Sequence, residues 1–201
     1  MANNIDPTRK VKAVALDFDG VITNLDIDWN DAIRQASSIV GHDIKSLITF
    51  YENNFGTPIF QKVSVEMEKL ELEALTKAQA TPYLKDFLEK LSEKQVETYI
   101  VSMQSVKVIK TFLDQHGLAR YFKDIISRER CPGKKAQVAF ILKEIGISPN
   151  QVLFVDDSKR NINNCKELGV ACFYFQRKQK PKETRDAWND ILSLISGPSR
   201  T

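Results

Sequence analysis

The chain alternates short apolar runs with segments of helical periodicity, and this alternation restricts its fold more than any other feature. Apolar residues that recur at i, i+3, i+4 and i+7 indicate amphipathic helices, whereas short β-branched or aromatic runs indicate buried strands. Strands that alternate with helices favour a mainly parallel sheet with helices on both faces. The predicted strands are residues 11–16, 98–101, 125–126, 152–155 and 170–175.

Local signals predict where several helices begin and end. Thr81 is predicted to be an N-cap and Pro82 the first helical residue, because these residue types are favoured at those positions. Three glycines follow the apolar stripes of later helices, and glycine readily adopts the left-handed conformation that ends a helix. We therefore expect helix ends at Gly117, Gly146 and Gly169.

One stretch interrupts the alternation. Residues 24–80 show three helical patterns and no convincing strand. An insert after the first strand would stand over the carboxyl edge of the sheet, where ligands bind in open α/β folds. The expected fold class is α/β, a Rossmann-like parallel sheet with a small all-helical cap. We expect a core of residues 1–23 and 81–201 and a cap of residues 24–80.

Composition excludes several classes of protein. The net charge of +3 over 201 residues is too small to indicate nucleic-acid binding. No apolar run reaches the roughly 18 residues of a membrane span, and residues 1–10 are too polar for a signal peptide, so we expect a cytoplasmic protein. Three cysteines and two histidines supply neither a zinc site nor a Ser-His-Asp triad. The oligomeric state cannot be predicted from these features.

Two carboxylates follow the first predicted strand. Asp17 and Asp19 are two residues apart, so on an extended chain their side chains share a face, and Gly20 permits a sharp turn after them. Like charges this close repel unless a cation or a shared proton holds them. Taken alone, the segment is explained equally well as an acidic turn.

Two other predicted strands also end in polar residues. Ser102 follows the second strand, and Asp156 and Asp157 follow the fourth. The carboxyl ends of parallel strands meet at one edge of a sheet, so these groups are expected to converge there with the acids of the first strand. A cluster of carboxylates requires a cation, and an all-oxygen ligand set favours Mg²⁺.

Basic groups are predicted near the same edge. Lys134 and Lys135 stand at the start of one helix, and the spacing to Gly146 favours Lys134 as the residue that faces the acids. A helix that starts near Ser105 would add backbone N–H donors for a phosphate group. Together these residue types indicate phosphoryl transfer through an aspartyl-phosphate.

These residues resemble the haloacid dehalogenase superfamily in its phosphatase branch. Residues 17–21 (DFDGV) resemble the DxDG[TV] motif, and residues 155–161 (VDDSKRN) resemble the metal-binding fourth motif. Ser102 ends an apolar strand as the second motif does, and Lys134 precedes an amphipathic helix as the third does. The helical cap of residues 24–80 is similar to the C1-type cap of the phosphoglycolate phosphatases.

The resemblance implies a role for each of these residues. Asp17 would attack phosphorus, Asp19 would protonate the leaving oxygen and then activate water, and Lys134 would neutralise charge. The implied ligands of Mg²⁺ are Asp17, Asp19 through its backbone carbonyl, Asp157, and Asp156 either directly or through another ligand. The implied contacts of the phosphate group are Gly20, Ser102, the amide of Met103, and Lys134. The partner would be a small-molecule phosphate ester.

Two features depart from the family pattern or concern specificity. Asn161 stands where many relatives carry another acid, which predicts weaker Mg²⁺ binding. In the cap, Arg34, Lys45 and Lys62 are candidates for substrate recognition by position alone. The remaining basic segments, Arg128 with Arg130 and residues 176–185, are interpreted as exposed loop charges.

Other functions remain open at this point. A carbon–halogen hydrolase needs neither Asp19 nor Asp157, so their presence argues against it. A phosphosugar mutase of the same fold is not excluded, because its chemistry differs only in returning the phosphoryl group. A non-enzymatic phospho-aspartate signalling or binding module would place the phosphorylated residue on a later strand.

Overall fold

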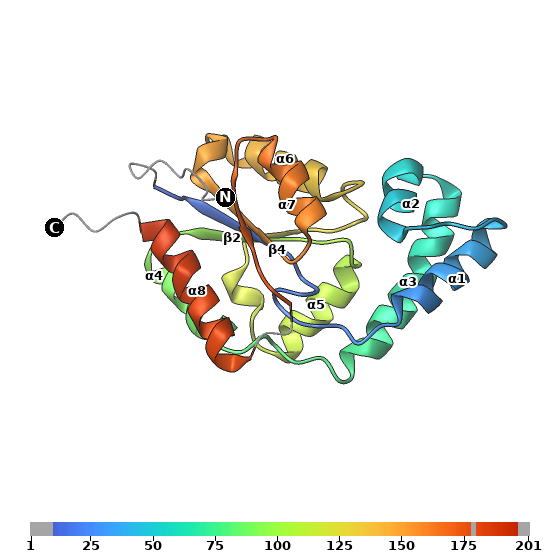
Figure 1. Ribbon diagram of the computed structural model, residues 1–201, viewed down its shortest axis with the longest axis horizontal. Coiled ribbons are helices and arrows are strands. Elements are labelled where there is room, and N and C mark those ends of the chain that lie inside the picture. Colours follow the sequence, from blue (N-terminus) through green and yellow to red (C-terminus); the bar gives the residue numbers. More distant parts are fainter. Residues whose placement is uncertain (1–9, 178–179, 197–201) are drawn as a thin grey trace.

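A computed structural model describes residues 10–177 and 180–196, and it contains a five-stranded parallel sheet (Figure 1). The strand order is β3-β2-β1-β4-β5, so the first strand lies at the centre. All five predicted strands are confirmed, with ends that differ by no more than two residues. They are β1 (Ala13–Leu16), β2 (Glu97–Val101), β3 (Asp124–Ile126), β4 (Val152–Asp156) and β5 (Ala171–Tyr174).

Helices cover both faces of the sheet, as the alternation predicts (Figure 1). Helices α4 (Leu84–Glu93), α5 (Val106–Gln115) and α8 (Pro181–Ser196) pack on one face. Helices α6 (Lys134–Ile145) and α7 (Lys159–Lys166) pack on the other. Two short 3₁₀ segments, Ala119–Tyr121 and Pro149–Gln151, precede β3 and β4.

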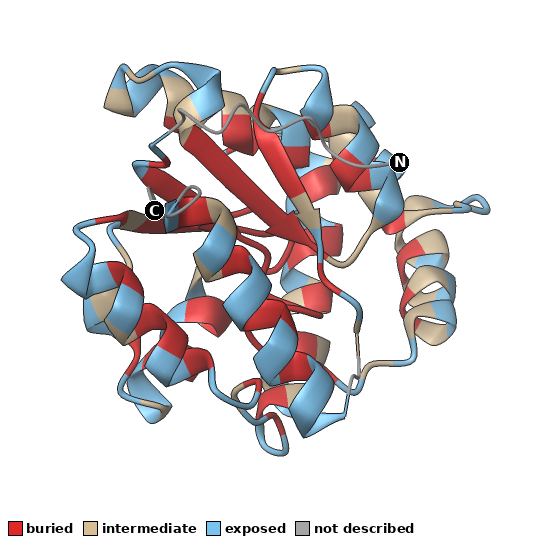
Figure 2. Cartoon of the chain, turned by 60° about the vertical axis from the view of Figure 1, so that its left-hand side comes forward, coloured by how far each residue is buried: buried red, intermediate tan, exposed pale blue. Residues whose placement is uncertain are grey.

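The central strand shows why the sheet requires helices on both sides. Val14 and Leu16 belong to the apolar cluster of one face, whereas Ala13 and Ala15 belong to that of the other. All four side chains are buried, and Figure 2 shows the neighbouring strands buried as well. A parallel strand buried on both faces is a continuous apolar run, which is the pattern seen in the sequence.

The inserted segment is helical and stands to one side of the core (Figure 1). It comprises α1 (Trp29–Val40), α2 (Leu47–Asn54) and α3 (Pro58–Leu75). Its helices have an apolar cluster of their own, centred on residues such as Ala32, Phe60 and Val63. An antiparallel bridge between Thr23 and Ala80 joins the two points at which the chain leaves and re-enters the core.

The predicted N-cap at Thr81 is wrong. Helix α4 begins at Leu84, and the residue before it, Tyr83, has a left-handed conformation with φ 62°. The Thr81 hydroxyl instead donates to the Val21 carbonyl at 2.7 Å. This contact ties the returning chain to the loop after β1, and it occupies the side chain that the local signal assigned to capping. Gly146 does end α6 in a left-handed conformation, as expected.

Two expectations concern the ends of the chain or the membrane. The prediction that no signal peptide is present concerns residues 1–10, of which residues 1–9 lie outside the described part. Over the residues that the structure describes, no helix combines the length and apolar character needed to cross a bilayer.

Candidate active site

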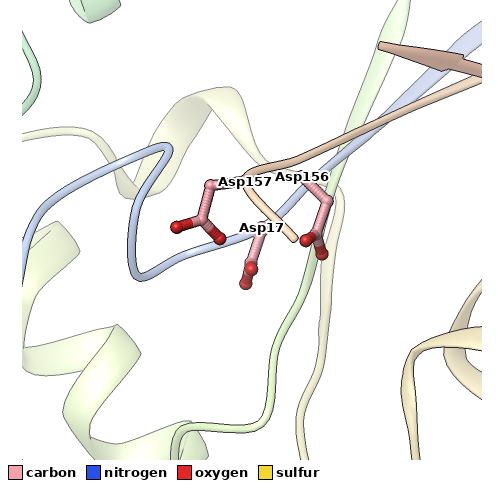
Figure 3. A group of neighbouring side chains, drawn as sticks. All are labelled: Asp17, Asp156 and Asp157. Atoms are coloured by element: carbon pink, nitrogen blue, oxygen red, sulfur yellow. The ribbon is translucent and has the colours of Figure 1, made fainter. Parts of the chain in front are cut away.

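Three carboxylates meet at the carboxyl edge of the sheet (Figure 3). One oxygen each of Asp17, Asp156 and Asp157 lies within 4.8 Å of the others. The parallel pairing of β1 with β4 sets this geometry, since Leu16 is in register with Val155 and the Asp17 amide donates to the Val155 carbonyl at 2.9 Å. The strand ends therefore bring these acids together although they are far apart in the sequence.

Lys134 is the basic residue of this cluster. Its ammonium group contacts Asp17 Oδ1, lies 2.6 Å from the Val101 carbonyl, and lies 3.4 Å from Asp156 Oδ2. Lys135 points away and pairs with Glu167 at the surface, at 2.6 Å. Lys134 is the first residue of α6, which fixes its side chain toward the strand ends. The structure thus places Lys134, and not Lys135, among the acids.

Burial makes charge in this cluster costly. Burial raises the pKa of Asp17 well above its usual value, because the opposing effect of Lys134 is smaller. Burial also raises the pKa of Asp157. Burial alone would lower the pKa of Lys134, yet Asp17 and Asp156 together raise it above its usual value. A divalent cation bound by oxygen would relieve the repulsion among the acids, so the donor set fits Mg²⁺.

Asp156 and Asp157 differ in how their oxygens are engaged. Asp156 is fully buried, and it accepts hydrogen bonds from the Ser158 amide at 2.7 Å and from Asn161 Nδ2 at 3.1 Å. Asn161 thus acts as a donor to Asp156, a contact that an ionised acid at this position could not make. The Asp157 side chain is 17% exposed, and among the described residues it accepts no amide hydrogen bond, so apart from its ion pair with Arg177 its oxygens are less engaged than those of Asp156.

Asp19 lies beside the cluster and has an ion-pair partner that was not predicted from the sequence. Its Oδ1 accepts from the Leu25 amide at 2.8 Å, and its Oδ2 lies 2.6 Å from Arg177 Nη2. Arg177 Nε lies 2.8 Å from Asp157 Oδ2, close enough for an ion pair but not aligned as a hydrogen bond. The interpretation of residues 176–185 as solvated is therefore wrong for Arg177. Its place just beyond β5 was the available signal, because it stands at the same sheet edge.

The loop after β2 presents different atoms from those expected. Ser102 is fully buried, and its hydroxyl donates to Gln104 Oε1 at 2.6 Å. Met103 and Gln104 line the cavity described below, whereas Ser102 does not. Helix α5 begins directly after Ser105, which caps it by accepting from the Val108 amide at 3.2 Å. The predicted helix start is confirmed, but the Ser102 hydroxyl is already engaged by a neighbour.

A cavity of about 340 Å³ lies between the acids and the inserted helices. On the side of the sheet its lining includes Asp17, Asp19, Asp157 and Lys134, and the inserted helices contribute both apolar and polar side chains. The apolar side chains of the cap that line it are Trp29, Ile33, Leu47 and Ile48. Of the three cap cations singled out in the sequence, Lys45 lines this cavity and the other two do not. Gly20 does not line it either.

A buried ion pair joins the inserted helices to the core. Arg128, in the loop after β3, is fully buried and contacts Glu71 of α3 at 2.5 Å. Arg128 also donates to Ser64 Oγ at 2.7 Å and to the Met103 carbonyl at 2.9 Å. The interpretation of Arg128 as an exposed charge is therefore wrong. Burial raises the pKa of Glu71 to about 7, although Arg128 opposes this shift.

Gly20 has no room for a side chain. A Cβ atom built at Gly20 would lie 2.3 Å from Asp157 Oδ2 and 2.8 Å from Arg177 Nε, and φ at Gly20 is +99°. We expect Gly20→Ala to displace Asp157. Turnover of a phosphate ester, the substrate class that the resemblance implies, should then fall about a hundredfold, since shifts of about 1 Å in a site have effects of this size. Steady-state kinetics measure this change.

Gly41→Ala is the matched control for that substitution. Gly41 also has a positive φ, +83°, but a Cβ atom there would meet nothing within 4 Å. Both variants are expected to lose about 1–3 kcal/mol of unfolding free energy through backbone strain. Equal turnover in the two variants would contradict the prediction that Gly20 is required for the position of Asp157.

Comparison with known proteins identifies similar sequences and a similar fold. Residues 14–175 match the family model described as haloacid dehalogenase-like hydrolase. A Pseudomonas putida protein named as a probable phosphoglycolate phosphatase is 33% identical over 94 residues, which are 45% of this chain and 38% of that protein. The phosphoglycolate phosphatase of Vibrio cholerae is 26% identical over 83% of this chain and 84% of its own.

A solved structure extends the similarity to the fold. A haloacid dehalogenase-like family hydrolase from Streptococcus pneumoniae superposes with a TM-score of 0.61 at 18% identity. The superposition covers 88% of this chain and 97% of the other. At this identity the likeness concerns the fold, and it agrees with the parallel sheet and the inserted helices described above.

Proposed function

The chain belongs to the haloacid dehalogenase-like hydrolases, and from this premise we propose that it hydrolyses a small phosphate monoester through an aspartyl-phosphate, with Mg²⁺. One observation carries this proposal: Asp17 directly follows the central strand, in contact with Lys134 and within 4.8 Å of Asp156 and Asp157. A buried carboxylate beside a fixed cation and two further acids suits a nucleophile that must approach an anionic phosphate.

The metal would be held by Asp17 and Asp157, with the backbone carbonyl of Asp19 as a further ligand and Asp156 directly or behind them. When bound, Mg²⁺ supplies positive charge that offsets the charge of the phosphoryl oxygens and of the acids. Lys134 offsets the remaining negative charge at Asp17, which it already contacts in this structure. The amide of Met103 would supply a backbone donor at the same edge, whereas the amides of Ser105 and Val106 at the start of α5 already donate to Glu71 and Glu129.

The proposed reaction has two steps. In the first, an oxygen of Asp17 forms a bond to phosphorus while the bond to the leaving oxygen breaks, and Asp19 gives that oxygen its proton. In the second, Asp19 takes a proton from water as the water oxygen attacks phosphorus. The Asp17–phosphorus bond then breaks, which restores the carboxylate and releases inorganic phosphate.

The substrate is proposed at the level of its class. The named relatives are phosphoglycolate phosphatases, which makes phosphoglycolate the first metabolite to test. The cavity would hold the leaving group against the apolar cap residues, and Lys45 would meet any negative charge that this group carries. Sugar phosphates and nucleotides are the natural comparison substrates, because they differ from phosphoglycolate in size and polarity.

The first experiment is a metal-dependence assay with p-nitrophenyl phosphate. We expect hydrolysis with Mg²⁺ and a fall of at least about a hundredfold when EDTA removes the metal, because the phosphoryl oxygens then lack the positive charge of Mg²⁺. Release of p-nitrophenolate is followed by absorbance, and added Mg²⁺ should restore the rate. Full turnover in EDTA would contradict the metal requirement. A screen of phosphoglycolate, sugar phosphates and nucleotides then ranks the substrates by kcat/KM.

A further inference from the structure

Arg177 contacts two acids that have roles of their own in the proposed reaction. Its guanidinium lies 2.6 Å from Oδ2 of Asp19, the proposed acid–base, and 2.8 Å from Oδ2 of Asp157, a proposed metal ligand. The Phe175 amide donates to the Asp156 carbonyl at 3.0 Å, and this contact brings the chain after β5 to the edge of the acids. The ion pair with Asp157 occupies a carboxylate oxygen that a bound metal would need.

The charges around the acids divide into two groups. Lys134 contacts Asp17 and Asp156, whereas Arg177 contacts Asp19 and Asp157. Over the described residues, no third cation forms an ion pair with any of these four acids. Arg177 is thus the ion-pair partner of Asp157 in this structure, and it limits the repulsion between Asp157 and its acidic neighbours.

We propose that Arg177 is an internal counter-ion that holds Asp157 without metal and withdraws from it when a divalent cation binds. The proposal rests on the metal site of the proposed function. Mg²⁺ binds carboxylate oxygens at about 2.0–2.1 Å, and a guanidinium on the same oxygen would be repelled by its double charge. The Arg177 side chain is 32% exposed, so solvent is open to it on one side.

This exchange has a consequence for metal affinity. Binding of the cation includes the loss of the Arg177–Asp157 ion pair, so the observed affinity is weaker than that of the acids alone. Before metal binds, the same ion pair stabilises the folded chain. Removal of the guanidinium should therefore strengthen metal binding and weaken the metal-free protein, two effects of opposite direction from one substitution.

The test is calorimetric titration of the purified protein with MgCl₂ alone at constant ionic strength. We expect Arg177→Gln to lower the Kd for Mg²⁺ about tenfold, and Arg177→Lys to lower it by a smaller factor, because lysine cannot form the two-pronged contact. Lys135→Gln removes a cation that pairs only with Glu167 at the surface, and it should leave the Kd unchanged. If only the net charge of the site affected binding, Arg177→Lys would have the same Kd for Mg²⁺ as the wild type.

Thermal unfolding supplies the second measurement. In EDTA, Arg177→Gln should unfold at a lower temperature than the wild type, and saturating Mg²⁺ should remove most of that difference. Circular dichroism at the titration temperature confirms that each variant is folded, and Arg177→Lys serves if the glutamine variant is not. An unchanged or weaker Mg²⁺ affinity in both Arg177 variants would overturn the proposal.

The outcome is separable from that of the proposed function, since no substrate is present. Tighter Mg²⁺ binding by Arg177→Gln, together with a wild type that has no phosphatase activity, would support the counter-ion proposal and refute the phosphatase proposal. Metal-dependent hydrolysis combined with unchanged Mg²⁺ affinity in both variants would support the phosphatase proposal and refute the counter-ion proposal. Failure of the wild type and of both variants to bind Mg²⁺ would refute the counter-ion proposal.

Discussion

Asp17→Asn is expected to lower phosphatase turnover by at least about a thousandfold, because an amide cannot form the covalent intermediate. The substitution preserves the shape of the side chain, and it removes a carboxylate whose pKa is raised by burial and by the neighbouring acids. The fold should survive, because Asp156 remains as an ion-pair partner for Lys134, and circular dichroism checks this. Initial rates with p-nitrophenyl phosphate measure the loss.

The control for this prediction is Asp114→Asn. Asp114 lies on α5, is exposed, and does not line the cavity next to Asp17. Its replacement makes the same chemical change away from the site and should leave turnover within about a factor of two, as surface substitutions generally do. A folded Asp17→Asn variant with wild-type turnover would exclude Asp17 as the nucleophile.

Trapping of the intermediate distinguishes Asp17 from its acidic neighbours. In Asp19→Asn, the water of the second step lacks its base, so phosphate should remain on the enzyme long enough to be found after rapid quenching. Peptide mass spectrometry should locate the phosphoryl group on Asp17. A phosphoryl group on Asp156 or Asp157 would assign the covalent step to a different strand end.

Arg128→Met is expected to lower the free energy of unfolding by about 3–5 kcal/mol, because it leaves Glu71 buried without its partner. The two side chains are 0% and 2% exposed, so water cannot replace the missing guanidinium. The substitution also removes a hydrogen bond to the Met103 carbonyl, next to the proposed phosphate site. Denaturant unfolding measures the stability, and kcat/KM well below the midpoint measures the effect on the site.

Arg130→Met is the matched control, because Arg130 belongs to the same loop and pairs with Asp124 at the surface. Those two side chains are 40% and 43% exposed, and an exposed pair contributes at most about 1 kcal/mol. Adding Glu71→Leu to Arg128→Met should recover part of the lost stability, because no uncompensated carboxyl then remains. Equal stability of the Arg128→Met and Arg130→Met variants would contradict the prediction.

The acids at the strand ends were predictable from sequence because two local patterns determine them. Apolar, β-branched runs mark buried strands, and parallel strands necessarily meet at one edge. Asp17, Asp156 and Asp157 each follow such a run, so their convergence required no knowledge of side-chain packing. The helical insert between the first and second strands followed from periodicity in the same way, and so did the start of α5 after Ser105.

The ionic contacts of the site were not predictable from those patterns. Arg128 and Arg130 look alike in the sequence, yet one is fully buried against α3 and the other is exposed. Thr81 carries a local capping signal, but a carbonyl in the loop after β1 takes its hydroxyl. The partners of charged and hydroxyl side chains depend on which groups lie close in space. Periodicity along the chain carries no information about those distances.

The sequence alone therefore determines the sheet, the helical insert and the strand-end position of Asp17, because backbone pairing and burial follow from local residue order. The folded chain decides which cations reach the acids. The spacing to Gly146 already favours Lys134 over Lys135 at Asp17, in agreement with the structure, but only the folded chain brings Arg177 from beyond the last strand to Asp19 and Asp157. The physical reason is that long basic side chains reach across elements whose relative positions only the packed core establishes.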